Sequence, residues 1–66
     1  MAKSEIHKKF GARIQELRKK QGLTQEDLAA AIGVDRSYMG FVERGERNPT
    51  LDKIAKIAQA LKARLP

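Results

Sequence analysis

The side chains of this chain that could do chemistry are suited to binding rather than to catalysis. The 66 residues include one histidine, His7, and no cysteine. The Ser, His and Asp residues follow no spacing recognised for nucleophilic catalysis, and there is no glycine-rich phosphate loop. His7 has no partner at metal-ligand spacing. We therefore expect no catalytic residues, no enzymatic activity, no metal and no cofactor.

The distribution of charge points to an anionic partner. The chain has 14 Lys and Arg against 8 Asp and Glu, which gives a formal net charge of +6 and a pI near 10.1. Residues 1–22 and 51–66 carry +5 and +3, whereas residues 23–50 carry −2. Such an excess of positive charge favours a polyanion such as nucleic acid. The lysine pairs at 8–9 and 19–20 are interpreted as solvated faces that attract an anion at long range.

The length of the chain limits its organisation to one domain, residues 1–66, with a small core. No apolar run approaches the roughly 20 residues that span a bilayer, and the N-terminus lacks the apolar centre of a signal peptide. Cytoplasm is the expected compartment. Little room exists for a pocket of about 300 Å³, so we expect neither a small-molecule ligand nor a membrane partner.

Residues 24–45 contain two short helical patterns, 25–32 and 36–44, that meet at the single glycine Gly33. A turn of this length crosses two helices at a steep angle, so the second helix protrudes and can enter a DNA major groove. The pattern is that of a helix-turn-helix. The apolar residues that face inward are Leu28, Ala29 and Ile32 in the first helix, and Met39 and Val42 in the second.

Residues with capping side chains precede both helices of the motif. Thr24 and Asp27 form a capping-box variant, with Asp in place of the usual Glu or Gln. Asp35 is expected to cap the second helix. In the loop 47–50, Thr50 is the expected cap of a further helix.

Two longer amphipathic patterns flank the motif. Apolar residues recur 4, 4 and 3 apart at Ile6, Phe10, Ile14 and Leu17. Ser4 is the expected N-cap of this helix, Gly22 its C-terminal stop, and Gly11 an interior residue that costs about 1 kcal/mol relative to Ala. A second stripe runs from Leu51 to Leu61 through Ile54, Ile57 and Ala58.

These patterns predict an all-α, compact bundle of four helices, or of five if Ala63 to Pro66 keep remnants of another. There is no strand pattern, no low-complexity segment and no convincing repeat. The predicted core consists of Phe10, Ile14, Leu17, Leu23, Leu28, Ile32, Val34, Met39, Val42, Leu51, Ile54, Ile57 and Leu61.

Three stretches of sequence are specific when taken together: Leu23 to Ala29 (LTQEDLA), Ile32 to Val34 (IGV) and Glu43 to Leu51 (ERGERNPTL). With them, residues 10–61 resemble the Cro/repressor-type (XRE-like) helix-turn-helix family of phage repressors and bacterial regulators. Asp35 to Tyr38 is also similar to the controller proteins of restriction–modification systems. The resemblance implies a lambda-repressor-like bundle and a sequence-specific transcriptional regulator that binds double-stranded DNA. It also implies a homodimer on a palindromic operator.

The resemblance further implies roles for individual residues. The positions that read bases are Arg36, Ser37, Tyr38 and Phe41. The positions that bind backbone phosphates are Gln25, Arg44, Arg47, Asn48, Thr50 and Lys53. Arg18 and Glu43 correspond to an ion pair between helices under the motif. For Gln25 the physics agrees, since the N-terminus of a helix favours an anion.

Each base-reading position has an alternative interpretation. Arg36 is the strongest candidate, because its fork matches guanine O6 and N7; the alternative is a solvated side chain that the helix dipole slightly disfavours. Ser37 either contacts DNA or is solvated, and Tyr38 either donates to a phosphate or covers the edge of the core. Phe41 either contacts a thymine methyl group or folds back onto the core margin.

Two features depart from the family pattern. Gly40 and Phe41 stand on the exposed face of the second motif helix, where polar residues are commoner, so base preference does not transfer from relatives. The chain also stops near the end of the last helix, which makes it either a minimal member or a truncated one. An alternative function is a protein-interaction module, such as an antitoxin or an adaptor, which the acidic centre and Phe41 favour.

Overall fold

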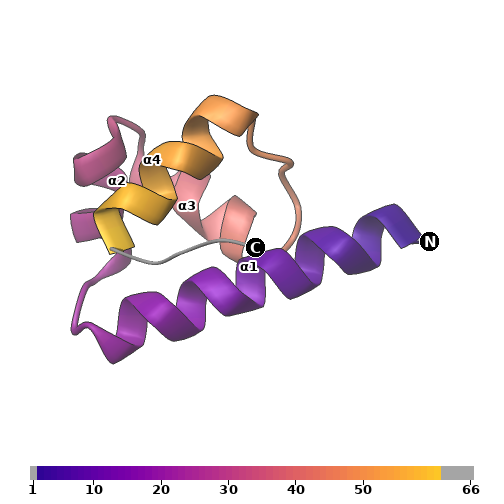
Figure 1. The fold of residues 1–66 in the computed structure, drawn as a ribbon, viewed down its shortest axis with the longest axis horizontal. Coiled ribbons are helices and arrows are strands. Elements are labelled where there is room, and N and C mark those ends of the chain that lie inside the picture. The colour runs from indigo at the N-terminus through magenta and orange to yellow at the C-terminus, as the bar shows by residue number, and fades with distance from the viewer. Residues whose placement is uncertain (1, 62–66) are drawn as a thin grey trace.

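The computed structural model of the chain describes residues 2–61, which form four helices and, within that range, no strand. The helices are α1 (Ala2–Lys20), α2 (Gln25–Ile32), α3 (Arg36–Glu43) and α4 (Leu51–Leu61). The prediction of an all-α bundle is confirmed, whereas the suggested remnants of another helix at 63–66 lie outside the described residues. Figure 1 shows α1 running along one side of the group formed by α2, α3 and α4, with its N-terminal end projecting past them.

The start of α1 differs from the sequence prediction. The helix already includes Ser4, which therefore lies inside the helix and not at its N-cap. Ala and Lys favour helix and no Gly or Pro precedes them, so the helix continues back to Ala2. Ile6, the first residue of the predicted apolar stripe, is 63% exposed because this part of α1 projects beyond the other helices (Figure 1).

The first turn of α2 is fixed by the predicted capping box. The Thr24 hydroxyl accepts a hydrogen bond of 3.0 Å from the Asp27 N–H, and Asp27 Oδ2 accepts one of 2.9 Å from the Thr24 N–H. The bond from the Thr24 N–H to the carboxylate above all, and the nearby Thr24 hydroxyl to a smaller degree, hold the pKa of Asp27 below its ordinary value. Thr50 caps α4 as predicted, with its hydroxyl accepting a 3.3 Å bond from the Lys53 N–H.

The turn between α2 and α3 depends on Gly33. Its φ of +75° lies in the left-handed region, where a residue with a Cβ is strained. The N–H of Val34 then donates back to the Ala29 carbonyl at 2.9 Å, which closes the end of α2. Asp35 occupies the N-cap position of α3 as expected, but the predicted capping bond from its side chain is not formed.

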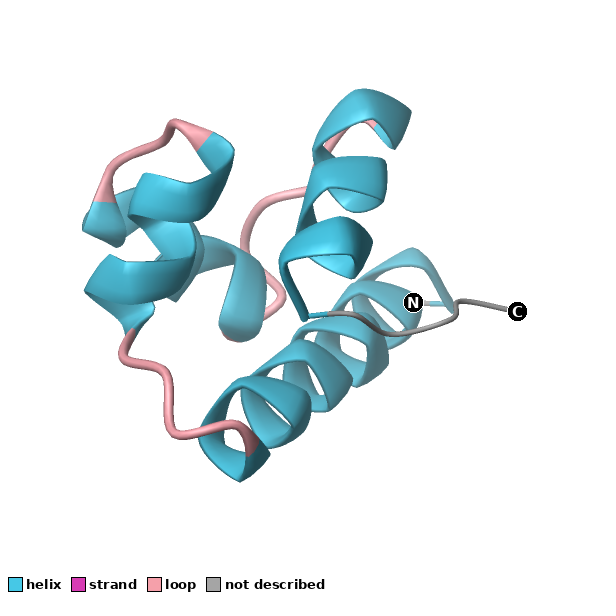
Figure 2. Ribbon diagram, turned by 60° about the vertical axis from the view of Figure 1, so that its left-hand side comes forward, coloured by secondary structure: helices cyan, strands magenta, loops and turns pink. Residues whose placement is uncertain are grey.

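The core lies where the four helices meet, and Figure 2 shows α1 and α4 packed beside the crossed pair of α2 and α3. The buried apolar residues are Ile14, Leu28, Ala29, Ile32, Met39, Val42, Ile57 and Leu61. Phe10, Leu17, Leu23, Val34 and Ala60 pack against them while partly exposed. Ile54 is likewise half-buried.

One predicted core residue, Leu51, is 84% exposed. Leu51 stands six residues before Ile57, on which the buried face of α4 is centred. At about 100° per residue, this spacing turns Leu51 roughly 120° away from Ile57. The prediction failed because a spacing of three residues repeated from Leu51 drifts around the helix.

The interior glycine of α1 has a packing role that the sequence did not reveal. A Cβ at Gly11 would lie 2.5 Å from the carbonyl oxygen of Glu43 and closer still to that of Val42. The backbone of α1 can therefore approach the C-terminal end of α3 only because residue 11 has no side chain. This close approach sets the distance between α1 and α3.

Candidate nucleic-acid interface

The outer face of α3 gathers the four residues expected to read bases. Arg36, Ser37 and Phe41 are exposed and Tyr38 is half-buried. Met39 and Val42, on the opposite face of the same helix, are at most 1% exposed. Packing of this inner face holds α3 in place, so that the outer face is available to a partner.

A buried ion pair fixes the C-terminal end of α3 to α1. Arg18 Nε lies 2.7 Å from Glu43 Oε2, and Arg18 Nη2 lies 3.1 Å from Glu43 Oε1. A third nitrogen of the guanidinium, Nη1, donates to the Leu23 carbonyl at 2.8 Å. Both charged residues are only 7% exposed. The ion pair expected from the resemblance is therefore present, and its polar groups are satisfied by hydrogen bonds.

The same carboxylate also supports the N-terminal end of α3. Gln25 Nε2, at the start of α2, donates a 3.0 Å hydrogen bond to Glu43 Oε1. Arg36 Nη1 in turn donates to Gln25 Oε1 at 3.3 Å. A relay of side chains thus runs from Arg18 through Glu43 and Gln25 to Arg36. It begins in the core and ends at the strongest candidate for base reading.

The side-chain contacts of Gln25 differ from those expected from the sequence. Its side chain is directed toward Glu43 and Arg36, and both of its polar atoms already have partners. Sequence reasoning considered Gln25 only as a phosphate ligand and missed its contact with Arg36. Eleven residues separate the two, so no helical spacing could have signalled the contact.

Two arginines lie against the aromatic side chains of α3. The guanidinium carbon of Arg44 is 5.2 Å from the centre of the Phe41 ring. That of Arg47 is 5.8 Å from the Phe41 ring and 5.9 Å from the Tyr38 ring. These distances are in the range of cation–π attraction. Phe41 is 37% exposed, so part of its ring is open to solvent.

The residues expected to bind phosphates continue from the end of α3 into α4. Arg44, Arg47, Asn48 and Thr50 are exposed, and Lys53 in the first turn of α4 is half-buried. Since Arg47 contacts both aromatic rings, the loop that carries it lies beside the outer face of α3. Two of the phosphate-binding candidates, Arg44 and Arg47, therefore lie next to the base-reading candidates Tyr38 and Phe41.

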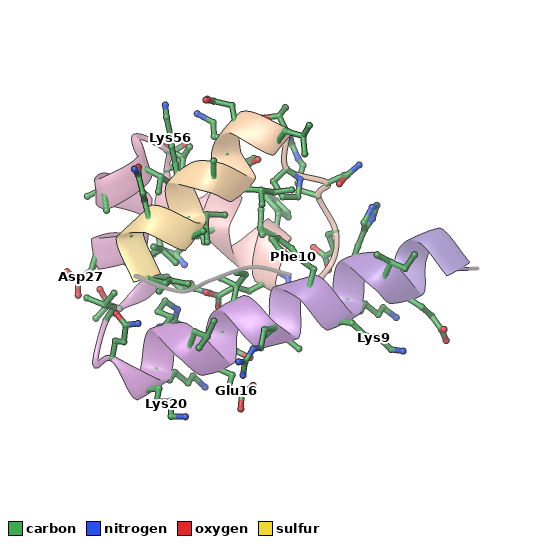
Figure 3. All side chains as sticks on the ribbon, in the orientation of Figure 1. Lys9, Phe10, Glu16, Lys20, Asp27 and Lys56 are labelled. Carbon is green, nitrogen blue, oxygen red and sulfur yellow. The ribbon has the colours of Figure 1, made fainter. Side chains whose placement is uncertain are left out.

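The labelled lysines of α1 point elsewhere. Figure 3 shows Lys9 and Lys20 on the outer side of α1, directed away from the other helices, whereas Phe10 faces them. These lysines contribute positive potential but lie outside the surface formed by α3 and the following loop. Beneath that surface, the buried charge of Glu43 is compensated by Arg18.

An open groove of about 700 Å³ lies between the end of α2 and α4. It is larger than the chain length suggested, because α4 touches α2 through residues with small side chains. It is lined by Ala30, Ala31, Ile32, Gly33, Lys56, Gln59 and Ala60. Polar groups come only from Lys56 and Gln59, so the groove lacks the convergent set typical of a ligand site.

Residues 2–61 contain no group of three or more His, Cys, Asp or Glu side chains placed to hold a metal ion. Over the same range, every helix is too short or too polar to cross a bilayer.

The fold and the surface together define a helix-turn-helix domain. Its two helices, α2 and α3, cross at a glycine turn, and α3 packs on the core with its inner face and is exposed on its outer face. Comparison with protein families agrees, since the model described as helix-turn-helix matches residues 14–66. The chain belongs to this family, of the XRE-like type that the sequence resembled.

Individual relatives extend over most of the chain. An uncharacterized HTH-type transcriptional regulator of Archaeoglobus fulgidus is 47% identical over 53 residues, 80% of this chain and 76% of the relative. The control protein C.MunI of a Mycoplasma species is 41% identical over 59 residues, 88% and 80% of the two chains. Among solved structures, the restriction–modification controller protein C.AhdI from Aeromonas hydrophila superposes with a TM-score of 0.87. It is 52% identical and is covered to 91%, as is this chain.

Proposed function

We propose that the chain is a sequence-specific DNA-binding transcriptional regulator that places α3 in the major groove. One observation carries the proposal: α3 is anchored by its buried face and by the relay from Arg18, while its outer face presents Arg36, Ser37 and Phe41 together. The major groove is wide enough to admit an α-helix and displays a distinct pattern for each base pair. The regulators among its relatives support the same class.

The outer face of α3 then reads bases. Arg36 is suited to guanine, because its fork matches the O6 and N7 acceptors, and the bond that it donates to Gln25 restricts its orientation before DNA arrives. The exposed ring of Phe41 is suited to the methyl group of thymine. Ser37 and Tyr38 supply hydroxyl groups at the edges of this face.

The surroundings of α3 bind the DNA backbone. Arg47, Asn48, Thr50 and Lys53 follow α3 in the chain, and the N-terminus of α2 offers backbone N–H groups beside Gln25. Contacts of this kind set the position of a protein on the duplex without reading its sequence.

In this proposal the protein acts as a homodimer on a palindromic operator. Two copies of α3 would then occupy successive major grooves, about 34 Å apart. Similarity to C.MunI and C.AhdI supports a controller of a restriction–modification operon, and a phage- or plasmid-type repressor is the other candidate. The cytoplasm is the proposed compartment.

Selection of bound sites from random DNA duplexes tests this function. We expect an enriched sequence made of two inverted half-sites whose centres are about 10–10.5 base pairs, or a multiple, apart. Enrichment of a single half-site would contradict the dimer. No enriched sequence at all would contradict sequence-specific binding.

A second candidate function is a protein-interaction module. It is favoured by the apolar side chains of Phe41 and Leu51, which are 37% and 84% exposed. Retention on immobilised random duplex DNA separates the two candidates. A DNA-binding protein is retained at low salt and elutes as salt rises, because it releases condensed counterions. An adaptor elutes without retention.

A further inference from the structure

Gly40, which the sequence placed on the exposed face of α3, is buried, and its missing side chain leaves a gap over which the side chain of Arg44 lies. Arg36, Gly40 and Arg44 follow one another at intervals of four residues, so they form a single row along one side of α3. In the middle of the row, Gly40 contributes no side chain. The atoms that a Cβ at residue 40 would meet belong to the Arg44 guanidinium, with Nη1 at 3.1 Å.

Arg44 is held in this position by two contacts. Its guanidinium carbon is 5.2 Å from the centre of the Phe41 ring, and its Nε donates a 3.2 Å hydrogen bond to Glu46 Oε1. The side chain nevertheless stays 56% exposed. Among the described residues, no hydrogen bond engages its two Nη groups, which are the atoms that form a fork toward a base.

We infer that Arg44 is a base-reading residue, in place of the phosphate ligand that its position in the sequence suggested. The inference rests on the proposed function and deepens it. The guanidinium borders the space that a side chain at residue 40 would fill and lies against the ring of Phe41. Since an arginine fork pairs with guanine O6 and N7, the surface presents two guanine readers, Arg36 and Arg44, on one row.

The experiment uses the duplex that the full chain itself selects, together with every single-base variant of that duplex. Binding is measured for the unchanged chain and for Arg44→Ala, Gly40→Ala and Arg36→Ala. Arg13→Ala is the matched control: Arg13 also pairs with a nearby glutamate, Glu16, at 3.0 Å, is similarly exposed, and lies on α1 outside the surface. Circular dichroism of each variant verifies folding.

We expect Arg44→Ala to weaken binding to the selected duplex by roughly 5- to 150-fold and to remove the preference at one base pair. That base pair differs from the one affected by Arg36→Ala. Gly40→Ala keeps the arginine but displaces its guanidinium, so it weakens the preference at the same base pair as Arg44→Ala, to a smaller degree. Arg13→Ala leaves all base preferences unchanged.

Equal losses on selected and random duplexes for Arg44→Ala, with base preferences intact, would overturn the inference and return Arg44 to the phosphate ligands. Unchanged preferences in Gly40→Ala would overturn the role of the gap at residue 40. In both cases the unchanged chain still prefers its selected duplex, so the proposed function stands. A lack of preference in the unchanged chain would overturn both proposals.

Discussion

The amide of Gln25 donates a 3.0 Å hydrogen bond to the Glu43 carboxylate, which is already paired with Arg18. Through its other polar atom, Gln25 accepts a bond from Arg36. A single glutamine at the start of α2 therefore connects the buried ion pair to the exposed end of α3. From this connection we derive separate predictions for the stability of the fold and for the recognition of DNA.

Gln25→Ala should weaken discrimination at the base pair read by Arg36 while leaving the fold nearly unchanged. Loss of the bond to Arg36 is expected to cost about 0.5–1.5 kcal/mol, or roughly 2- to 12-fold in preference. Glu43 keeps Arg18, so urea unfolding should change little. Gln59→Ala, on the exposed side of α4, is the control for both measurements. An equal loss on selected and random duplexes would show that Gln25 acts only on phosphate.

Arg36→Ala and Lys53→Ala should affect DNA binding in different ways. The first removes a base contact, so it should cost roughly 1–3 kcal/mol on the preferred site and relax choice at one base pair. The second removes a backbone contact, so it should weaken all sequences alike. Titrations against selected and random duplexes measure both. Equal factors on the two duplexes for Arg36→Ala would contradict its assignment.

The Arg18–Glu43 pair should show strong coupling in a double-mutant cycle. Arg18→Met or Glu43→Leu alone leaves one buried charge without a partner, at a cost of up to about 3–5 kcal/mol. Arg18→Met also removes the donor to the Leu23 carbonyl. The double variant should lose much less than the two single losses together, as measured by urea unfolding. Additive effects below about 0.5 kcal/mol each would mean that these are ordinary surface charges.

Gly11→Ala should destabilise the fold although alanine favours helix. The added Cβ would collide with the backbone carbonyl groups of Val42 and Glu43, so α1 and α3 must separate. We expect a net loss of about 1–3 kcal/mol in the free energy of unfolding. Gly40→Ala is the matched control, because its Cβ meets only the far end of the Arg44 side chain and no backbone atom, so this variant should gain up to about 1 kcal/mol. Equal changes in the two variants would contradict the packing role of Gly11.

DNA affinity should fall steeply as salt rises. The net charge of +6 and the arginines, lysine and helix N-termini beside α3 indicate several phosphate contacts. Each neutralised phosphate should contribute about −0.9 to the slope of log K against log salt. Fluorescence anisotropy with a random duplex between low and physiological salt gives the slope. A slope near zero would show that phosphate contacts do not provide the affinity.

The fold was predictable from the sequence where local patterns decide it. The Thr24 and Thr50 caps, the Gly33 turn and the bounds of α2 and α3 all follow from residues within a few positions of one another. The predictions failed where burial depends on how the helices are placed relative to one another. Ile6 is exposed because α1 extends beyond the other helices. Leu51 is exposed because it lies at the start of α4 on the side that faces away from the core.

The candidate site was predictable as a set of residues but not as a network. The resemblance supplied both the ion pair of Arg18 and Glu43 and the base-reading candidates of α3, Ser37 and Phe41 among them. The contact of Gln25 with Arg36 depends on the angle between two helices. The place of the Arg44 guanidinium depends on its rotamers. Neither quantity is encoded in residue spacing.

The division of α3 into an inner and an outer face has a consequence for how specificity can change. Met39, Val42 and Glu43 hold the helix, whereas Ser37 and Phe41 make no contact on which the core depends. Exchanging the outer residues alone should therefore transplant the operator preference of one relative onto the scaffold of another. On the proposed function, operator preference can therefore change through substitutions on the outer face of α3 while the core and the fold stay the same.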